Sequence, residues 1–203
     1  EKLNQGQTID AWKTGKDIIT IFNSIKDVSN IESKVNQLKA TNKVTSYQQQ
    51  KDNVLQREDR EKRKLYKGLQ ERNRQWWESE LSSMQRKKNY GSRHVSNLNA
   101  RLLNFISMMA YSNLEKAFSN QQFNQIPRLL KIYEAADPDN PDVYYFKAKH
   151  AALNNQSDQA LHHLKTAIKK GYDEPNKLKN DRLFRNLDGS TIQSLASLAK
   201  KNR

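Results

Sequence analysis

Two short helical patterns separated by a polar turn, in residues 142–175, limit the fold more than any other feature of this chain. Apolar residues recur at spacings of three and four in Asp142 to His150 and again in Asp158 to Lys170. The residues between them, 154–157, are all polar. Because small side chains let two helices pack closely, the pattern predicts an antiparallel helical hairpin. The facing residues are Tyr144, Ala148 and Ala151 on the first helix and Ala160, Leu164, Ala167 and Ile168 on the second.

The preceding segment, residues 110–138, repeats this order of features. One helical pattern ends at the polar residues 119–122, and a second pattern follows it and ends before Pro138 and Pro141. Proline cannot continue a helix, and the residue before it avoids the helical conformation. We therefore expect a second helical hairpin here. Its apolar residues are Leu114, Ala117 and Phe118, followed by Ile126, Leu129, Leu130 and Tyr133.

The better hairpin resembles a tetratricopeptide repeat, a helix–turn–helix unit of about 34 residues. With Tyr144 at the fourth position of that pattern, alanines fall at three positions that require small residues, and Leu164 falls at a bulky one. Lys147, Ala151 and Gly171 depart from the pattern. The earlier copy is more degenerate, with Ile126 and Tyr133 where small residues belong. A generic helical hairpin is the alternative, because its crossing also needs small residues.

Residues after Gly171 resemble the tail that often follows the last repeat in bacterial proteins of this family. Two short helices are expected there, covering the exposed end of the last hairpin, since a repeat array needs a cap with a polar outer side. Gly189 and Ser190 indicate a helix stop followed by a helix start. The resemblance covers about Asn104 to Leu198. The apolar residues of the tail are Leu178, Leu183, Phe184, Leu187, Ile192, Leu195 and Leu198.

The resemblance also implies a binding surface. In the family, the first helix of each hairpin lines a concave groove. Carried onto this sequence, the groove positions are Asp142, Tyr145, Lys149 and Ala152 in one copy and Met108, Tyr111, Glu115 and Phe118 in the other. Tyr145 and Lys149 could receive a carboxylate of a partner through a hydrogen bond and charge. The alternative is that two repeats are too few for a groove and that these residues pack against the front helices.

The front half of the chain predicts long helices. Apolar residues step by three or four from Thr8 to about Ala40, which favours one continuous helix. The pattern loses register at residues 40–43, and a second helix is expected from about Thr45 to Lys88. Two such helices can bury each other as an antiparallel pair. Residues 56–64 contain no apolar side chain, so that part of the second helix must be solvated.

Further along, residues 89–92 break the pattern, and Ser92 is a plausible cap for a third long helix through Phe118. Trp76 and Trp77 cannot both face one seam, because adjacent helical residues diverge; we expect one of them to pack in the core. We therefore predict an all-α protein. Residues 1–90 would form an elongated helical hairpin, and residues 91–203 would form a repeat-like domain with about two repeats and a cap.

The chain is strongly basic, with a formal net charge of +14 from 36 basic and 22 acidic residues. Such a charge raises the question of a polyanionic partner. Residues 51–75 mix both signs, as a solvated helix does. The acid-free patch is made of Arg86, Lys87, Lys88, Arg93 and Arg101. No nucleic-acid-reading motif accompanies it, so the solvated-face interpretation is favoured, with binding of nucleic acid or an anionic surface as the alternative.

Composition excludes several classes of protein and leaves the compartment open. There is no cysteine, so disulfides, thiolate zinc sites and a cysteine nucleophile are excluded. No apolar stretch approaches the length of a transmembrane helix. The chain begins with Glu1, and its Asn-, Gln- and Lys-rich start resembles a tether, which favours a bacterial extracytoplasmic location. A cytoplasmic location is the alternative.

Motifs for catalysis and cofactor binding are missing from the sequence. There is no glycine-rich phosphate loop, nucleophile elbow or paired His-Glu motif. The four histidines, His94, His150, His162 and His163, lack the spacing of a metal site. We therefore expect a non-catalytic adaptor without a cofactor or metal, which binds another protein or peptide. The alternatives are the basic nucleic-acid or surface binder and an architectural spacer, which could form a homodimer through its front helices.

Overall fold

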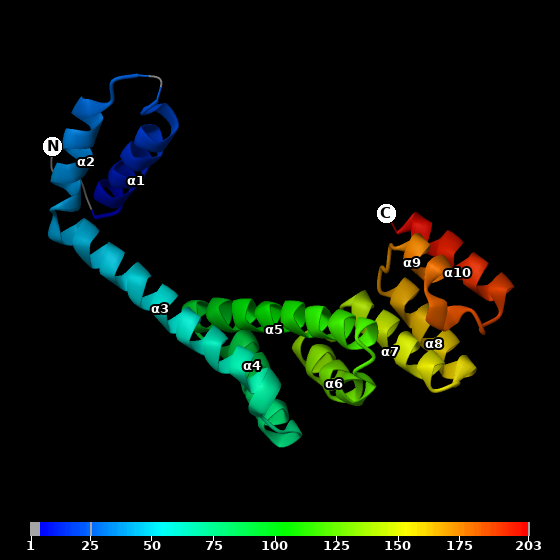
Figure 1. Ribbon diagram of the computed structural model, residues 1–203. Helices are drawn as coiled ribbons and strands as arrows, with labels where there is room; N and C mark the ends of the chain where they lie inside the picture. Colours follow the sequence, from blue (N-terminus) through cyan, green and yellow to red (C-terminus); the bar gives the residue numbers. More distant parts are fainter. Residues whose placement is uncertain (1–4, 25, 203) are drawn as a thin grey trace. The chain divides into compact units, whose positions relative to one another are not determined.

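The computed structural model describes residues 5–24 and 26–202, and this part of the chain is all-α, without a strand (Figure 1). This confirms the predicted fold class. No described helix is long and apolar enough to cross a membrane. The helices are α1 (Gln5–Phe22), α2 (Ser29–Lys39), α3 (Asn42–Glu71), α4 (Arg74–Tyr90), α5 (Arg93–Ser119), α6 (Ile126–Ala136), α7 (Pro141–Leu153), α8 (Ser157–Lys169), α9 (Pro175–Asn180) and α10 (Gly189–Lys201). Short 3-10 helices precede α6, η1 (Phe123–Gln125), and follow α9, η2 (Arg182–Phe184).

The chain forms two compact units, unit 1 (Glu1–Arg60) and unit 2 (Glu61–Arg203), with the division inside α3. From the sequence we placed a boundary after residue 90 instead. The reason for the difference is the environment of α4, which packs against α5 and α6. Trp77, Leu81 and Met84 of α4 are buried in the core of unit 2, so α4 belongs with the residues that follow it.

Unit 1 is a small helical hairpin with its own core. Helix α1 packs on α2, and Trp12, Val35 and Val44 form the buried core cluster of this unit. Trp12 also contacts Tyr47 edge to face, with ring centroids 6.4 Å apart. A Cβ atom at Gly15 would clash with the Val35 side chain. Glycine at this position therefore allows α1 and α2 to approach closely.

The prediction of one continuous helix from Thr8 to Ala40 is wrong. Helix α1 ends at Phe22, and α2 begins at Ser29, whose backbone N–H donates to the Asp27 side chain at 2.9 Å. The apolar stripe continued through the break because a three-to-four spacing survives a short turn, and the side chains on either side of the turn pack on each other. Ile25, part of that stripe, lies outside the described residues. The predicted turn near residues 40–43 is confirmed, since α3 begins at Asn42.

The predicted helix from Thr45 to Lys88 is also interrupted, and the expected long antiparallel pair is therefore wrong. Helix α3 ends at Glu71, and Asn73 caps α4 by accepting a hydrogen bond from the Trp76 N–H at 3.0 Å. Val54 and Leu55 of α3 are about half exposed, so this part of the helix does not bury an apolar face. As predicted, one tryptophan of the pair lies in the core: Trp77 is 2% exposed.

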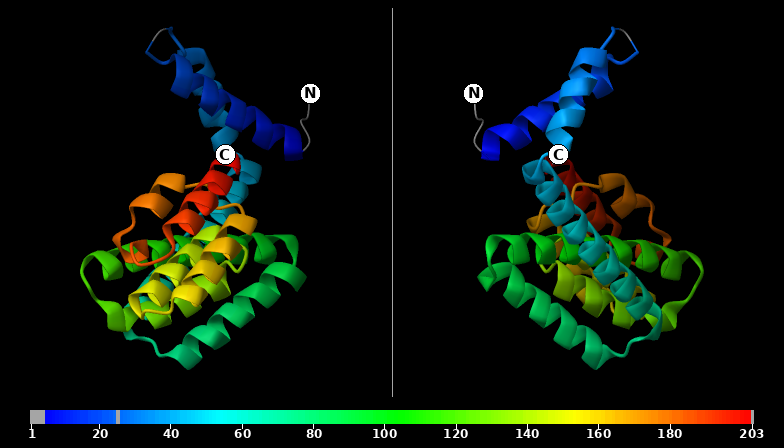
Figure 2. Two further views of the ribbon diagram at one scale, coloured as in Figure 1. Left: turned by 90° about the vertical axis from the view of Figure 1, so that its right-hand side faces the viewer. Right: turned by 90° about the vertical axis from the view of Figure 1, so that its left-hand side faces the viewer.

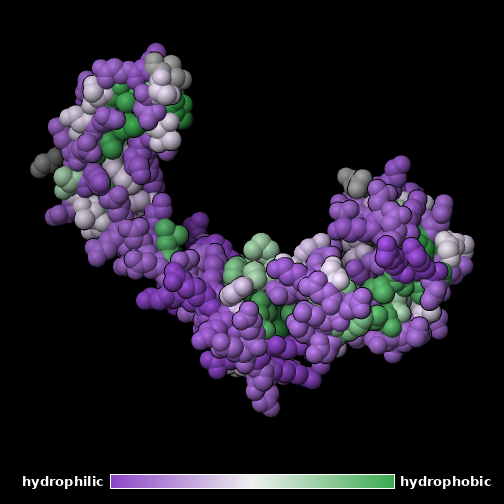
Figure 3. Space-filling model, in the orientation of Figure 1, coloured by the Kyte–Doolittle hydropathy of each residue, from purple (hydrophilic) through white to green (hydrophobic). Residues whose placement is uncertain are grey.

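Unit 2 stacks its helices in chain order. Figures 1 and 2 show α4, α5, α6, α7 and α8 following one another, each packed on the next, with α10 on α8. Apolar side chains gather inside, and the surface seen in Figure 3 is mainly hydrophilic, with small hydrophobic areas. The third long helix is confirmed as α5, although the Ser92 side chain makes no capping hydrogen bond. Helices that are consecutive in the chain therefore pack on each other, as short connections between antiparallel helices favour.

The hairpin of α7 and α8 is confirmed at the predicted place. Ala148, Ala160 and Ala167 are fully buried at its crossing. Asn155 in the turn and Gly171 after α8 have positive φ angles of 58° and 100°, which end the helices and reverse the chain. The predicted cap also forms: α9 and α10 pack on each other, and α10 covers α8. Leu198 differs from expectation, since it is 44% exposed.

Candidate partner-binding sites

The six residues predicted to bind a partner lie on neighbouring helices. Tyr111, Glu115 and Phe118 belong to α5, and Asp142, Tyr145 and Lys149 belong to α7. Phe146 of α7 joins the two sets: its ring lies 5.3 Å from that of Tyr111 and 5.9 Å from that of Phe118. The Lys149 ammonium lies 4.6 Å from the Phe118 ring centroid. The structure thus brings α5 and α7 together as the sequence indicated. Of the two further groove positions, Met108 is 61% exposed and Ala152 packs partly buried.

A carboxylate from the chain's own tail occupies the centre of this face. The Tyr145 hydroxyl donates a hydrogen bond to Asp181 Oδ2 at 2.8 Å, and Lys149 Nζ lies 3.1 Å from the same oxygen. The other carboxylate oxygen accepts the Leu183 backbone N–H at 3.0 Å. Tyr145 is 3% exposed, and the side chains of Lys149 and Asp181 are 11% and 12% exposed. The Tyr–Lys pair therefore already holds a carboxylate.

Burial sets the protonation of this face. Burial raises the pKa of Tyr145, and the nearby Asp181 carboxylate raises it further, so the phenol remains a neutral donor. Burial also raises the pKa of Asp142, with the negative charges of Glu174, Asp173 and Glu115 acting in the same direction and Lys177 opposing them. A shallow polar cavity of about 390 Å³ lies beside the pair and includes Glu115 and Lys177.

The predicted basic patch lies at the end of the α4–α5 hairpin. Arg86, Lys87 and Lys88 occupy the end of α4, and Arg93 and Arg101 belong to α5; all five are exposed. Cations in the last turn of a helix are favoured by its dipole, so Lys87 and Lys88 have a structural reason to be there. Sequence reasoning overlooked Tyr90, which lies between these residues and is 85% exposed.

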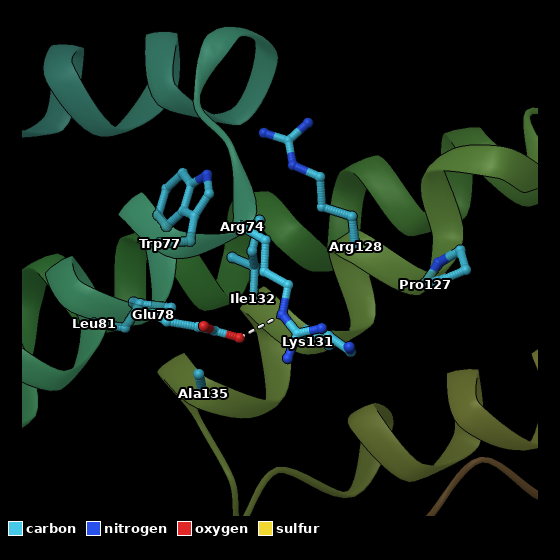
Figure 4. A pocket seen from close by; sticks show the side chains of 9 residues that line it. All are labelled: Arg74, Trp77, Glu78, Leu81, Pro127, Arg128, Lys131, Ile132 and Ala135. Carbon is cyan, nitrogen blue, oxygen red and sulfur yellow. Dashed lines mark hydrogen bonds and ion pairs between the residues drawn. The ribbon is translucent and has the colours of Figure 1, made fainter.

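An apolar cavity in unit 2 was not predicted. It lies between α4 and α6 and has a volume of about 220 Å³ (Figure 4). Its floor consists of the buried side chains of Trp77, Leu81 and Ile132, and Pro127 and the exposed Ala135 complete the apolar wall. The charged side chains around it are Arg74, Glu78, Arg128 and Lys131.

Polar contacts hold α6 against α4 at one end of this cavity, and against the end of α3 and the connection to α4 at the other. The Gln85 side-chain amide donates to the carbonyl oxygens of Ala135 and Ala136, both at 3.2 Å. At the other end, Arg128 Nη2 donates to the carbonyl oxygens of Gly68 and Arg72 at 3.1 and 2.7 Å. The cavity is therefore built into the packing of unit 2 and does not depend on a mobile loop.

One ion pair crosses the outer edge of the cavity. Arg74 Nε lies 2.5 Å from Glu78 Oε1 on the next turn of α4, and the two side chains are 66% and 56% exposed (Figure 4). Exposed pairs of this kind contribute little to stability, because water solvates both charges well. Its members can therefore exchange partners at low energetic cost.

A signal for this cavity did exist in the sequence. In residues 126–136, Ile132 and Ala135 lie on a different side from the apolar residues assigned to the hairpin. A helix with apolar side chains on more than one side must pack against more than one neighbour. The pattern could not reveal that the second neighbour is α4, because α5 separates the two helices in the sequence.

Among the described residues, no group of three or more histidine, aspartate or glutamate side chains is placed to hold a metal ion. His162 and His163 contact each other, with ring centroids 5.7 Å apart, and neither joins a cluster of carboxylates. Burial lowers the pKa of His150 and of His163.

Similar proteins of known function would indicate what these surfaces bind, provided that they align with this chain. No family model, curated protein or solved structure matches this chain.

Proposed function

We propose that this protein is a non-catalytic adaptor that binds another protein or peptide through the helical hairpins of unit 2. The observation that carries the proposal is the apolar cavity between α4 and α6, whose floor reaches the buried Trp77, Leu81 and Ile132. Its exposed apolar wall, Pro127 and Ala135, would gain free energy when another apolar group covers it. A ready-made depression of this kind is typical of a surface that receives a partner.

The tetratricopeptide-like character of α7 and α8 supports the same class of function. Ala148, Ala160 and Ala167 are fully buried at the crossing, as the small positions of that repeat would require. Helical repeats present extended surfaces for other proteins. The relationship to this repeat family is part of the proposal.

The face formed by α5 and α7 is a second surface within the proposal. Tyr145 and Lys149 are engaged by Asp181, so the partner contacts would fall to the half-buried residues around them. Those residues are Tyr111, Glu115 and Asp142, of which Glu115 lines the polar cavity. We place the primary contact at the α4–α6 cavity, because its apolar wall has no covering group among the described residues.

A capture experiment tests the proposal. The full chain would be immobilised and exposed to a lysate of its native host, alongside two variants. Ala135→Trp fills the cavity from an exposed position, and Gln159→Trp places the same side chain on the exposed side of α8. We expect a protein that is captured by the wild type and by Gln159→Trp and lost with Ala135→Trp. Equal capture by all three would contradict the proposed site.

One observation favours a second function, binding of single-stranded nucleic acid. Tyr90 is 85% exposed in a stretch, residues 81–114, that contains five basic side chains and no acidic one. Cations together with an exposed aromatic ring are the elements used to bind such strands. Affinity for an oligonucleotide that falls steeply with salt, and falls again in Tyr90→Ala, would support this function. Salt-insensitive capture of a protein would support the adaptor.

A further inference from the structure

We infer that the α4–α6 cavity receives a large apolar side chain from an acidic amphipathic helix of a different protein, with carboxylates of that helix pairing with Arg74 and Lys131. This inference rests on the proposed adaptor function and specifies the chemistry of its partner. Size, shape and charge of the cavity each contribute to it.

The volume fits a side chain better than a small molecule. The cavity measures about 220 Å³, whereas sites for small molecules usually enclose roughly 300–1,000 Å³. A cavity of this size matches one large apolar side chain, such as Phe, Trp or Leu. Such anchors in well-packed pockets supply most of the energy of a protein interface.

The position of the cavity fits a helical ligand. It lies in the seam between α4 and α6 (Figure 4). Gln85 ties α4 to α6, and Arg128 ties α6 to the end of α3 and the connection that follows it, so the seam is already formed. An amphipathic helix can lie along such a seam and insert residues spaced by three and four into it. Because the seam is already formed, little conformational freedom is lost on its side of the interface.

The charges around the cavity select an acidic partner. Arg74, Arg128 and Lys131 surround it, and Glu78 is the one acid among its lining residues. Arg128 is committed to the carbonyl oxygens of Gly68 and Arg72, which leaves Arg74 and Lys131 to meet the partner. The exposed Arg74–Glu78 pair can exchange, since a new carboxylate would replace Glu78 at similar energy.

The same charges argue against a second copy of this chain. Unit 2 contains 26 basic and 14 acidic residues, and unit 1 contains 10 basic and 8 acidic residues. Neither unit has an acidic balance that would complement the cations at the cavity. Like charges facing each other across an interface oppose association, so a different, acidic protein fits the site.

A display selection tests the inference without knowing the partner. A library of helical peptides, with a fixed apolar stripe and random residues beside it, would be selected on the full chain and counter-selected on Ala135→Trp. Circular dichroism would confirm that the variant is folded. We expect the surviving peptides to carry Asp or Glu next to the apolar anchor.

A charge-swap experiment then locates the carboxylates. In Arg74→Glu/Lys131→Glu, the affinity of a selected acidic peptide should fall about tenfold. The same peptide with Lys in place of its acids should bind this variant better than it binds the wild type. Lys165→Glu/Lys169→Glu, a double change on α8, serves as the matched control and should leave the affinity for the acidic peptide unchanged.

The outcomes separate this inference from the proposed function. Pocket-dependent peptides with basic or neutral flanks would overturn the acidic partner and leave the adaptor function in place. Failure to enrich any pocket-dependent helix would overturn the inference as a whole. The adaptor function itself would fall only if capture from the native host did not depend on the cavity.

Discussion

The α4–α6 cavity and the α5–α7 face are both surfaces between neighbouring helices of unit 2, and they differ in what fills them. On the α5–α7 face, Asp181 satisfies Tyr145 and Lys149 from within the chain. In the α4–α6 cavity, the exposed Pro127 and Ala135 form an apolar wall that no side chain fills, above a floor of buried residues. Buried charges need a partner for the fold to be stable, whereas a small apolar depression is tolerated. The centre of the α5–α7 face therefore serves the fold, whereas the α4–α6 cavity is the surface at which we propose that a partner binds.

The largest expected effect is a loss of stability when the contacts of Asp181 on the α5–α7 face are disrupted. Lys149→Glu places a second carboxylate against the mostly buried Asp181, and we expect it to lower the free energy of unfolding by about 3 kcal/mol or more. Urea unfolding followed by circular dichroism measures this. Lys149→Met keeps the apolar stem and leaves Asp181 paired with Tyr145, so its loss should be smaller. Equal stability of Lys149→Glu and the wild type would mean that this face does not need Asp181.

A smaller effect isolates the hydrogen bond. Tyr145→Phe removes the donor to Asp181 and keeps the ring packed, which should lower the free energy of unfolding by about 2 kcal/mol. The pKa of Tyr145 is raised by burial, so the phenol stays neutral, and the loss should be constant between about pH 6 and pH 9. Tyr144→Phe, on the same helix with its hydroxyl bound to the exposed Pro138 carbonyl, is the matched control and should lose less.

Lys149 and Tyr145, the residues changed in these two predictions, were assigned to a partner from the sequence. They show which parts of the fold and of the site the sequence could predict. The hairpin of α7 and α8 was predictable because Ala148, Ala160 and Ala167 are local and periodic. The meeting of α5 with α7 followed from the order of the hairpins. The role of Lys149 did not follow, because Asp181 lies in a tail with too little periodicity to place it against α7.

The predictions of long continuous helices at the front of the chain were wrong for a related physical reason. The apolar spacing carried through the turn between α1 and α2, since Ile19 and Ile31 pack on one core without belonging to one continuous helix. Ile21, on the predicted stripe, is 61% exposed. The break at Asn73 was equally hidden, because a single capping side chain ends a helix without disturbing the apolar pattern around it. Predicting the α4–α6 cavity would have required knowing which helices, distant in the sequence, pack on each other.

A pH-dependent effect sharpens the comparison further. Burial raises the pKa of Asp142, so protonation favours the folded state, and the contribution of this group to stability is greatest below its unfolded pKa and falls as pH rises through its folded pKa. Asp142→Asn should therefore gain slightly over the wild type at neutral pH, and the gain should disappear in acid. Thermal unfolding at several pH values measures it. A gain that grows as the pH is lowered would contradict this assignment.

The smallest expected effect on stability concerns the open cavity. Ala135→Leu adds an apolar side chain at an exposed position, and the free energy of unfolding should change by no more than about 0.5 kcal/mol. Binding of a partner should nevertheless be lost, because the added side chain takes the anchor's place. Urea unfolding and peptide binding of the same variant measure the two effects. Strong destabilisation would mean that the cavity is part of the fold.

The position of Asp181 has a consequence for the growing chain. A ribosome delivers α7 well before it delivers this residue, so during that interval Tyr145 and Lys149 stand without their carboxylate. Before Asp181 is synthesised, Tyr145 and Lys149 have no carboxylate of the chain to bind; in the folded protein Asp181 binds both. The arrival of Asp181 occupies that face with a carboxylate of the chain itself.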